Sequence, residues 1–186
     1  MDPDEIMLNT EESMEKAFDY LQHEFAAVRT GKASPGLVEN IDVEAYGSMM
    51  KLKQVALITT PEPRLIVIQP FDASTVHAIE KALKESRIGI NPNVDGKIIR
   101  LPISSLTEER RRELVKGIKH MAEESRVRIR SARRDGLEEL KKAEKGGGIT
   151  KDEVERYEKD VQKMTDDYVK KIEEALNLKE ADIMKV

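Results

Sequence analysis

The residue run best suited to a chemical role is rich in arginine. Between Arg126 and Arg134 the sequence RVRIRSARR places five arginines in nine residues, with no acidic residue among them. The planar guanidinium group matches phosphate oxygens with two parallel hydrogen bonds and also stacks on bases, so the run predicts contact with nucleic acid. Because aromatic residues make up only 4% of the chain, folded RNA contacted through its backbone is favoured over single strands bound by stacking.

Helical geometry decides whether these side chains share a face. Each residue of a helix is rotated by about 100° around the helix axis. Five basic residues of one predicted helix therefore fall within about 60° of one another around that axis. The centre of the apolar stripe lies about a third of a turn away from them. The five are Arg112, Lys119, Arg126, Arg130 and Arg133. We therefore expect an exposed basic line along a helix of about 57 Å, long enough to follow a nucleic-acid backbone.

The same arginines have a structural alternative. Charges on helical bundles commonly pair with acids three or four residues away, and Glu123, Glu138 and Glu139 flank the run. Local pairing is not expected to satisfy the run itself, because it contains no acid. Two interpretations stay open: an RNA-binding face, or the solvated surface of a helical scaffold or chaperone-like interaction protein.

Enzymatic chemistry has no matching set of residues. His23, His77 and His120 lie on separate predicted elements, without an acid or second histidine at metal-ligand spacing. Nucleophile-elbow, dinucleotide and HExxH patterns are missing, and neighbouring carboxylates such as Asp166 and Asp167 do not face each other on a helix. We predict that the protein is not an enzyme and uses no metal or cofactor. An unrecognised hydrolase is the third hypothesis, with no residues to support it.

Composition limits the class of protein. The formal net charge of −4 argues against indiscriminate nucleic-acid binding by the whole molecule, so any RNA contact must come from a local patch. The lack of cysteine rules out disulfides and fits a reducing compartment. The N-terminal segment is acidic without a signal-peptide core, and no stretch approaches 18 apolar residues. We expect a soluble, monomeric, cytoplasmic protein.

Three amphipathic helices are expected to carry the charged faces. The first covers residues 4–30, the second covers 107–144 with a threonine N-cap, and the third begins at Thr150, where Glu153 completes a capping box. Gly146–Gly148 breaks the chain between the last two helices and is expected to form a turn, not a phosphate-binding loop. An antiparallel three-helix bundle would bury all three apolar stripes.

The middle of the chain has a different pattern and predicts a small inserted α+β domain. Alternating or β-rich segments predict strands at 39–46, 54–60, 64–69 and 97–101, and an amphipathic segment predicts a helix at 74–86. The fold class is therefore α+β, with residues 1–30 and 106–186 in the bundle and 31–105 in the insert. Two linkers rich in Gly, Pro and Ser, 31–36 and 102–105, join them. They predict either a hinge or a rigid elbow.

Six segments together resemble the ribosome recycling factor family. They follow one another in the family's order across nearly the whole chain, and their combination is specific although each one alone is weak. The segments are Val28–Pro35, Tyr46–Gly47, Ile90–Asn93 with Gly96, Leu106–Arg112, Arg126–Asp135 and Val161–Asp166.

The resemblance implies an L-shaped molecule of transfer-RNA-like dimensions, with the bundle as long arm and a β/α/β sandwich as short arm. Family members bind the post-termination ribosome. With elongation factor G and GTP they separate the subunits and release messenger RNA for a new round of translation, and they hydrolyse nothing themselves. The elongation factor would meet the elbow and the short arm.

The resemblance also assigns residues. Contacts with large-subunit ribosomal RNA would fall on Arg29, Arg111, Arg130 and Arg133, with Arg126 and Arg134 as neighbours, and Arg133 is the strongest single candidate. The hinge would use Ala33, Ser34 and Pro35 on one linker and Pro102, Ile103, Ser104 and Ser105 on the other.

The sequence departs from the family pattern in the short arm and the second linker. Ala45 stands where the family often has tyrosine, and Ser48–Met50 replaces a turn that usually contains proline. Ser104 and Ser105 stand where prolines are common. These changes leave the arginines intact but put the turn geometry of the insert and the stiffness of the linker in question.

Overall fold

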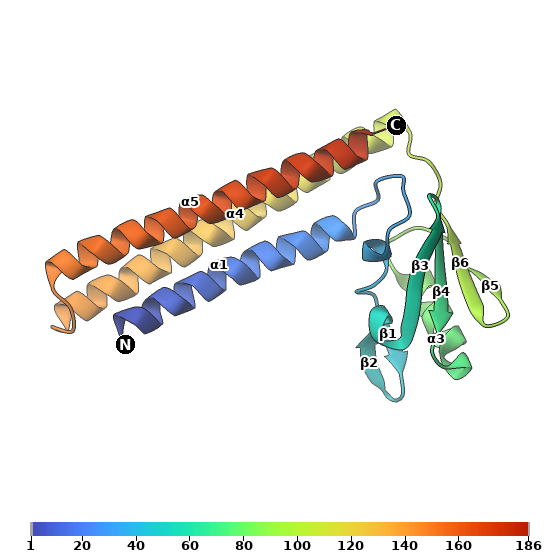
Figure 1. The fold of residues 1–186 in the computed structure, drawn as a ribbon, viewed down its shortest axis with the longest axis horizontal. Helices are drawn as coiled ribbons and strands as arrows, with labels where there is room; N and C mark the ends of the chain where they lie inside the picture. The colour runs from blue at the N-terminus through green and yellow to red at the C-terminus, as the bar shows by residue number, and fades with distance from the viewer. Residues whose placement is uncertain (1, 186) are drawn as a thin grey trace. The chain divides into compact units, whose positions relative to one another are not determined.

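The computed structural model describes residues 2–185 and divides the chain into two compact units (Figure 1). The first unit contains the described residues up to Phe25 together with Val115–Ala181. The second contains Ala26–Leu114 together with the described residues from Asp182 onward. Among residues 2–185, none of the helices is both long enough and apolar enough to cross a membrane.

Three long helices form the bundle: α1 (Pro3–Ala26), α4 (Glu108–Lys145) and α5 (Lys151–Met184). Contacts between them give their directions. Tyr157 donates a hydrogen bond to Asp4 at 3.1 Å, and the Phe18 and Tyr168 rings meet edge to face at 6.4 Å, so α1 and α5 run parallel. α4 returns antiparallel to both (Figure 1). This arrangement confirms the predicted three-helix bundle.

The ends of the two longest helices are fixed by the predicted caps. Thr107 Oγ1 accepts a hydrogen bond from the Arg110 amide at 3.1 Å, just before α4 begins. At the start of α5, Thr150 Oγ1 accepts from the Glu153 amide at 3.3 Å, and Glu153 Oε2 accepts from the Thr150 amide at 2.8 Å. This reciprocal pair is the capping box that the sequence predicts. Between the helices, Gly147 adopts a positive φ of 74°, which glycine tolerates without strain.

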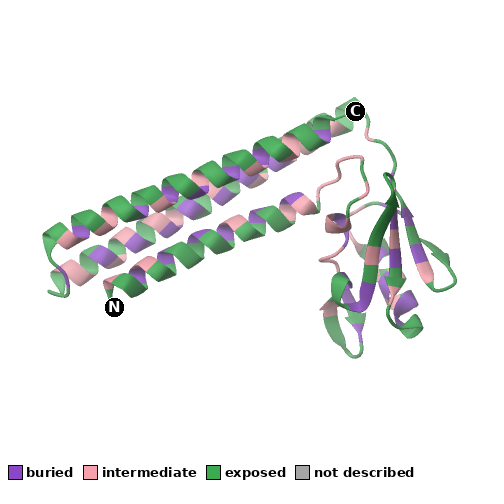
Figure 2. Cartoon of the chain, viewed as in Figure 1, coloured by how far each residue is buried: buried purple, intermediate pink, exposed green. Residues whose placement is uncertain are grey.

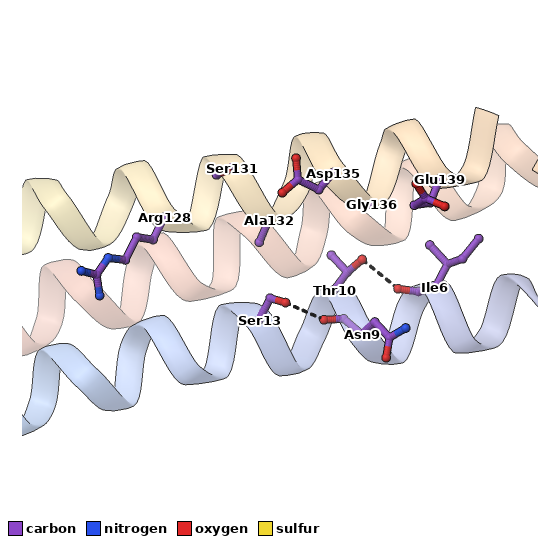
Figure 3. A pocket seen from close by; sticks show the side chains of 10 residues that line it. All are labelled: Ile6, Asn9, Thr10, Ser13, Arg128, Ser131, Ala132, Asp135, Gly136 and Glu139. Carbon is purple, nitrogen blue, oxygen red and sulfur yellow. Dashed lines mark hydrogen bonds between the residues drawn. The ribbon is translucent and has the colours of Figure 1, made fainter. Parts of the chain in front are cut away.

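The bundle core consists of the apolar stripes of the three helices, whose buried residues lie along their facing sides (Figure 2). The largest fully buried side chains include Ile6, Met14, Leu21, Ile118 and Ile129. α1 and α4 also approach each other closely where Gly136 of α4 faces Thr10 of α1. A Cβ atom added to Gly136 would lie 2.5 Å from Thr10 Oγ1, which is too close for a real side chain. Figure 3 shows these two residues facing each other in a groove between the helices. The helix spacing here depends on the missing side chain of one glycine.

The inserted segment forms two antiparallel sheets and short helices. A two-stranded hairpin pairs β1 with β2, and a four-stranded sheet has the order β3-β4-β6-β5. The strands are β1 (Asp42–Ala45), β2 (Ser48–Lys51), β3 (Ala56–Glu62), β4 (Leu65–Pro70), β5 (Asn93–Asp95) and β6 (Ile98–Pro102). The helices are η1 (Pro35–Leu37), α2 (Leu52–Val55), η2 (Ala73–Thr75) and α3 (Val76–Glu85). The predicted α+β class is confirmed.

A separate apolar core holds the insert together. Ile66 and Ile68 of β4 and Ile99 of β6 are completely buried, and Ile79 and Leu83 of α3 pack in the same cluster. Alternation along β4 and β6 turns one face of the sheet to this core, as expected for a sheet that is buried on one side. The insert thus has the apolar interior of a small domain.

Two predicted boundaries were wrong, and a specific contact explains each of them. The first helix ends at Ala26 instead of residue 30, because the chain returns at Gly36, where a Cβ would lie 3.1 Å from the Ala26 carbonyl oxygen. The predicted strand 54–60 begins only at Ala56, because the Gln54 side chain accepts the Lys51 amide at 2.8 Å and caps a helical turn before it.

Two strands were not predicted. β2 completes a hairpin whose two turn residues, Tyr46 and Gly47, both have positive φ, of 52° and 76°. Such a turn joins twisted strands directly, so the hairpin closes despite the unusual Ser48–Met50 segment. β5 has three exposed residues and hence no apolar alternation that the sequence could reveal.

Candidate nucleic-acid interface

Arg133 is held in place by a chain of hydrogen bonds from α5. Its Nη1 donates to Gln162 Oε1 at 3.1 Å, and Gln162 Nε2 donates to Asp166 Oδ1 at 2.9 Å. The Arg133 Nε is buried and has no hydrogen-bond partner among the described residues. The side chain is thus held by one neutral amide, and no acid among residues 2–185 is in direct contact with its charge.

Arg126 and Arg130 are paired with acids. Glu123 accepts from Arg126 Nη1 at 3.1 Å and from Arg130 Nη2 at 2.7 Å, and Glu173 of α5 accepts from Arg126 Nη2 at 2.9 Å. Hydrogen bonds from Arg130 and then Arg126 lower the pKa of the Glu123 carboxyl below its usual value. The expectation that local pairing could not satisfy this run was wrong. Glu123 lies just outside the run and reaches into it.

The other members of the expected basic line are also paired. Arg112 bonds Glu108 at 2.7 Å, and Lys119 lies 3.8 Å from Glu180 of α5. The Arg126 side chain is only 20% exposed. The expected exposed line is therefore corrected to four ion-paired cations and Arg133, whose hydrogen-bond partner is the neutral Gln162. Exposed ion pairs contribute only about 0–1 kcal/mol each to stability, so their cations can readily leave the carboxylate and bind another anion.

The remaining arginines of the run point elsewhere. The Arg128 guanidinium lies 4.6 Å from the centre of the Tyr20 ring on α1. The Arg134 side chain is 73% exposed, donates to Ser131 Oγ at 3.4 Å and lies 3.5 Å from the Asp135 carboxylate. The structure thus turns Arg126 and Arg133 toward partners on α5, whereas Arg128 faces α1.

Arg29 and Arg111 both belong to the second unit and are half-buried. Arg29 Nη2 donates to the Ser104 carbonyl at 3.2 Å, so it ties the chain just before the first linker to the second linker. The Nε atoms of both arginines are buried and have no hydrogen-bond partner among residues 2–185. Neither arginine forms an ion pair with a described acid, unlike Arg126 and Arg130.

The predicted hinge residues are anchored to one turn of the insert, between β3 and β4. The Ala33 amide donates to the Pro63 carbonyl and the Ile103 amide to the Arg64 carbonyl, both at 2.7 Å. Ser34 Oγ accepts from the Gly36 amide at 3.3 Å and caps η1, which starts at Pro35. Pro102 ends β6, and Ser104 and Ser105 are exposed. The hinge role of these residues concerns motion and stays a prediction.

Some residues that shape the site were not singled out from the sequence. Glu123 is the exception, because the structural alternative already named it as a pairing acid, three residues before Arg126. Gln162 and Glu173 lie on α5, and only the register between two helices brings them to α4. Within residues 2–185, no three His, Asp, Glu or Cys side chains gather as ligands for a metal ion.

Comparisons with known proteins, by sequence and by structure, all match this chain to the same family. A family model described as ribosome recycling factor matches residues 21–184. The ribosome-recycling factor of Akkermansia muciniphila is 55% identical over 188 residues, covering 100% of both chains. That of Rubrobacter xylanophilus is 49% identical over 178 residues, covering 96% of each.

Solved structures agree with the sequence relatives. A solution structure of the ribosome recycling factor matches with a TM-score of 0.79 and 43% identity, over 100% of this chain and 99% of that one. A second match has a TM-score of 0.68 and 40% identity, over 99% of this chain and 100% of that one. It belongs to models for the T. thermophilus ribosome recycling factor and the E. coli elongation factor G bound to the E. coli post-termination complex.

Proposed function

The chain belongs to the ribosome recycling factor family, and from this premise we propose that it binds the post-termination ribosome. With elongation factor G and GTP it then separates the subunits and releases messenger RNA. The matching factor that is bound, with elongation factor G, to a post-termination complex supports both partners. The family resemblance drawn from the sequence is confirmed. The prediction that the chain is not an enzyme is confirmed as well, because the family is one of non-enzymatic translation factors.

Arg133 carries the RNA-binding part of this proposal. Its guanidinium is oriented by Gln162, and no acid in the described part of the chain contacts it. A pre-positioned guanidinium loses little conformational entropy on binding and offers donors in the geometry that a phosphate accepts. We expect Arg133 to contact a phosphate of large-subunit ribosomal RNA. The other proposed contacts are Arg29, Arg111, Arg126, Arg130 and Arg134.

Arg126 and Arg130 would join the contact by exchanging partners. Both are held by Glu123, whose carboxylate is 55% exposed. RNA phosphates approaching this side of α4 compete with that carboxylate for the same donors. Each arginine then exchanges a carboxylate for a phosphate, so it contributes less binding free energy than an arginine without an acidic partner would. Arg133 is expected to dominate the affinity for this reason.

The location and the linkers follow from the same proposal. Because the proposed partners are ribosomes and elongation factor G, we infer a cytoplasmic location. The two linkers, 31–36 and 102–105, are inferred to permit the predicted bundle and insert to reorient during subunit separation. Their anchoring to the Pro63–Arg64 turn leaves the backbone outside those bonds, such as Ser104 and Ser105, to take up such a change.

The test uses Arg133→Ala with Arg128→Ala as a matched control on the same helix. Loss of one charge-assisted phosphate contact, about 1.5–3 kcal/mol, should weaken binding to purified large subunits by roughly 10- to 150-fold. Splitting of post-termination ribosomes with elongation factor G and GTP should fall in parallel. Arg128 faces Tyr20, so its removal should leave ribosome affinity near that of the unmodified chain. Equal affinities for all three proteins would contradict the assignment of Arg133, and absence of splitting by the unmodified chain would contradict the function.

A further inference from the structure

A small pocket in the second unit is surrounded by basic side chains. Its volume is about 190 Å³, and all of its lining residues belong to that unit. The polar side chains on its wall are Thr30, Lys32, Arg64, Ser105, Arg111 and Lys185. Four of these six are cations and two are hydroxyls, and none of the described residues that line the pocket is an acid. The pocket is therefore electropositive and rich in hydrogen-bond donors.

The four cations are free of the pairing that occupies the bundle arginines. Among the described residues, none of Lys32, Arg64, Arg111 and Lys185 lies within 4.0 Å of a carboxylate. The Arg111 Nε is buried and lacks a hydrogen-bond partner within residues 2–185. Several like charges around one cavity repel one another, and a bound anion relieves that repulsion.

The walls of the pocket are fixed by the backbone. The Ala33–Pro63 and Ile103–Arg64 hydrogen bonds, each 2.7 Å long, hold the two linker segments to the β3–β4 turn. Gly31, with φ of 80°, packs against Leu106, where a Cβ would lie 3.7 Å from Leu106 Cγ. The backbone that bears Lys32 and Arg64 is thus held in place before any ligand arrives, which lowers the entropic cost of binding.

We propose that this pocket binds one phosphate group. A phosphate accepts hydrogen bonds on several oxygens at once, and the pocket offers guanidinium, ammonium and hydroxyl donors from different segments of the chain. The source of the group is either the backbone of ribosomal RNA or a free phosphate. The first of these rests on the proposed function. It adds Lys32, Arg64 and Lys185 to the arginines already assigned to RNA contact.

The phosphate site is tested without ribosomes, on the full chain. Inorganic phosphate is titrated at constant ionic strength, with chloride as the balancing anion, and backbone amide resonances are followed by NMR. Saturable shifts are expected at Gly31 and Leu106, with at least a tenfold weaker apparent affinity in Arg64→Gln. Lys97→Gln removes an exposed cation that does not line the pocket and should titrate like the unmodified chain. Absence of pocket shifts, or equal titrations for both variants, would overturn the site.

Binding to purified large subunits then identifies the source of the phosphate. If RNA supplies it, Arg64→Gln weakens binding relative to Lys97→Gln and reduces the slope of log affinity against log salt by about one. Unchanged subunit affinity together with phosphate-dependent shifts assigns the pocket to a free phosphate. Lys32→Gln is a second variant that keeps the Arg64 turn intact. If the unmodified chain fails to bind ribosomes, the proposed function fails, while the phosphate titration still decides the pocket.

Discussion

Glu123 Oε1 accepts a hydrogen bond from Arg130 Nη2 at 2.7 Å, although seven residues separate the two on one helix. The other oxygen of the same carboxylate holds Arg126 at 3.1 Å. One acid thus occupies two of the guanidinium groups proposed to contact RNA. Glu123 is therefore expected to lower the affinity of this face for all polyanions, including RNA that is not the target.

Replacement of Glu123 by glutamine should increase RNA affinity. The change frees Arg126 and Arg130 from a charged competitor while it keeps the size of the side chain. We expect a gain of roughly two- to tenfold for large subunits at low salt, since exposed ion pairs are weak and screened. Affinity for unrelated RNA, measured with transfer RNA, should increase as well, so that the ratio between the two ligands falls.

The matched control is Glu138→Gln, which removes the same charge from α4 at a residue that accepts no hydrogen bond from the arginine run. If both variants bind equally better, the gain reflects net charge alone and the specific role of Glu123 is refuted. A weaker affinity of Glu123→Gln would show that the carboxylate positions the arginines instead of competing for them.

Gln162 should matter to RNA binding although it has no charge. It holds Arg133 Nη1 at 3.1 Å and is itself held by Asp166. Gln162→Ala leaves the guanidinium free to rotate, so we expect roughly a three- to tenfold loss of large-subunit affinity, about the free energy of one hydrogen bond. The effect should vanish in the Arg133→Ala background, as measured by a double-mutant cycle. Additive losses would mean that Gln162 acts independently of Arg133.

Periodicity and capping residues were sufficient to predict the long helices, because both depend on local spacing. Thr107 caps α4 through the Arg110 amide and Thr150 pairs with Glu153 at the start of α5, so each predicted cap joins residues three positions apart. The pairing of the arginines was not predictable in full. Contacts such as Arg126–Glu173 depend on how far α4 and α5 slide along each other, and the spacing of residues within either helix does not encode this.

The end of α1 illustrates the same limit. Helical spacing continues to Val28, yet the helix ends at Ala26 because Gly36 packs on its last turn. That contact involves a residue ten positions away that carries no side chain, so the helical spacing of apolar residues does not indicate it. The RNA assignments for Arg29 and Arg111 came from family resemblance alone. The structure adds that both lack an acidic partner among the described residues, which the sequence could not establish.

Two glycines of α4 provide opposite tests of bundle packing. A Cβ at Gly136 would lie 2.5 Å from Thr10 Oγ1 and 3.1 Å from Thr10 Cγ2, so Gly136→Ala forces α1 and α4 apart. Overpacking of this kind typically costs about 1–3 kcal/mol, partly offset by the higher helix propensity of alanine, about 1 kcal/mol. A decrease in the free energy of unfolding is expected, and urea denaturation measures it.

Gly117 is the matched control on the same helix. A Cβ there meets no atom within 4 Å, so Gly117→Ala should stabilise the protein by about 0.5–1 kcal/mol through helix propensity alone. Removal of the bulk at position 10, in Thr10→Ala with Gly136→Ala, should recover part of the loss. If Gly136→Ala is as stabilising as Gly117→Ala, the close approach of α1 and α4 does not exist in solution.

The capping box of α5 predicts a pH dependence of stability. The pKa of Glu153 is lowered, first by the backbone hydrogen bond from Thr150 and then by the bond from its hydroxyl. A lowered folded-state pKa means that the contribution of Glu153 is fully present above the ordinary glutamate range, and that it is lost as pH falls through the lowered value. Thr150→Ala should cost about 0.5–2 kcal/mol of unfolding free energy at neutral pH.

The pH dependence is tested with two glutamine variants. In Glu153→Gln the loss of stability at acid pH should be smaller than in the unmodified chain. Glu155→Gln replaces an exposed acid outside the cap and should lose as much stability at acid pH as the unmodified chain. Urea denaturation from pH 7 to pH 3 measures both, and identical pH profiles for the two glutamine variants would show that the box does not form.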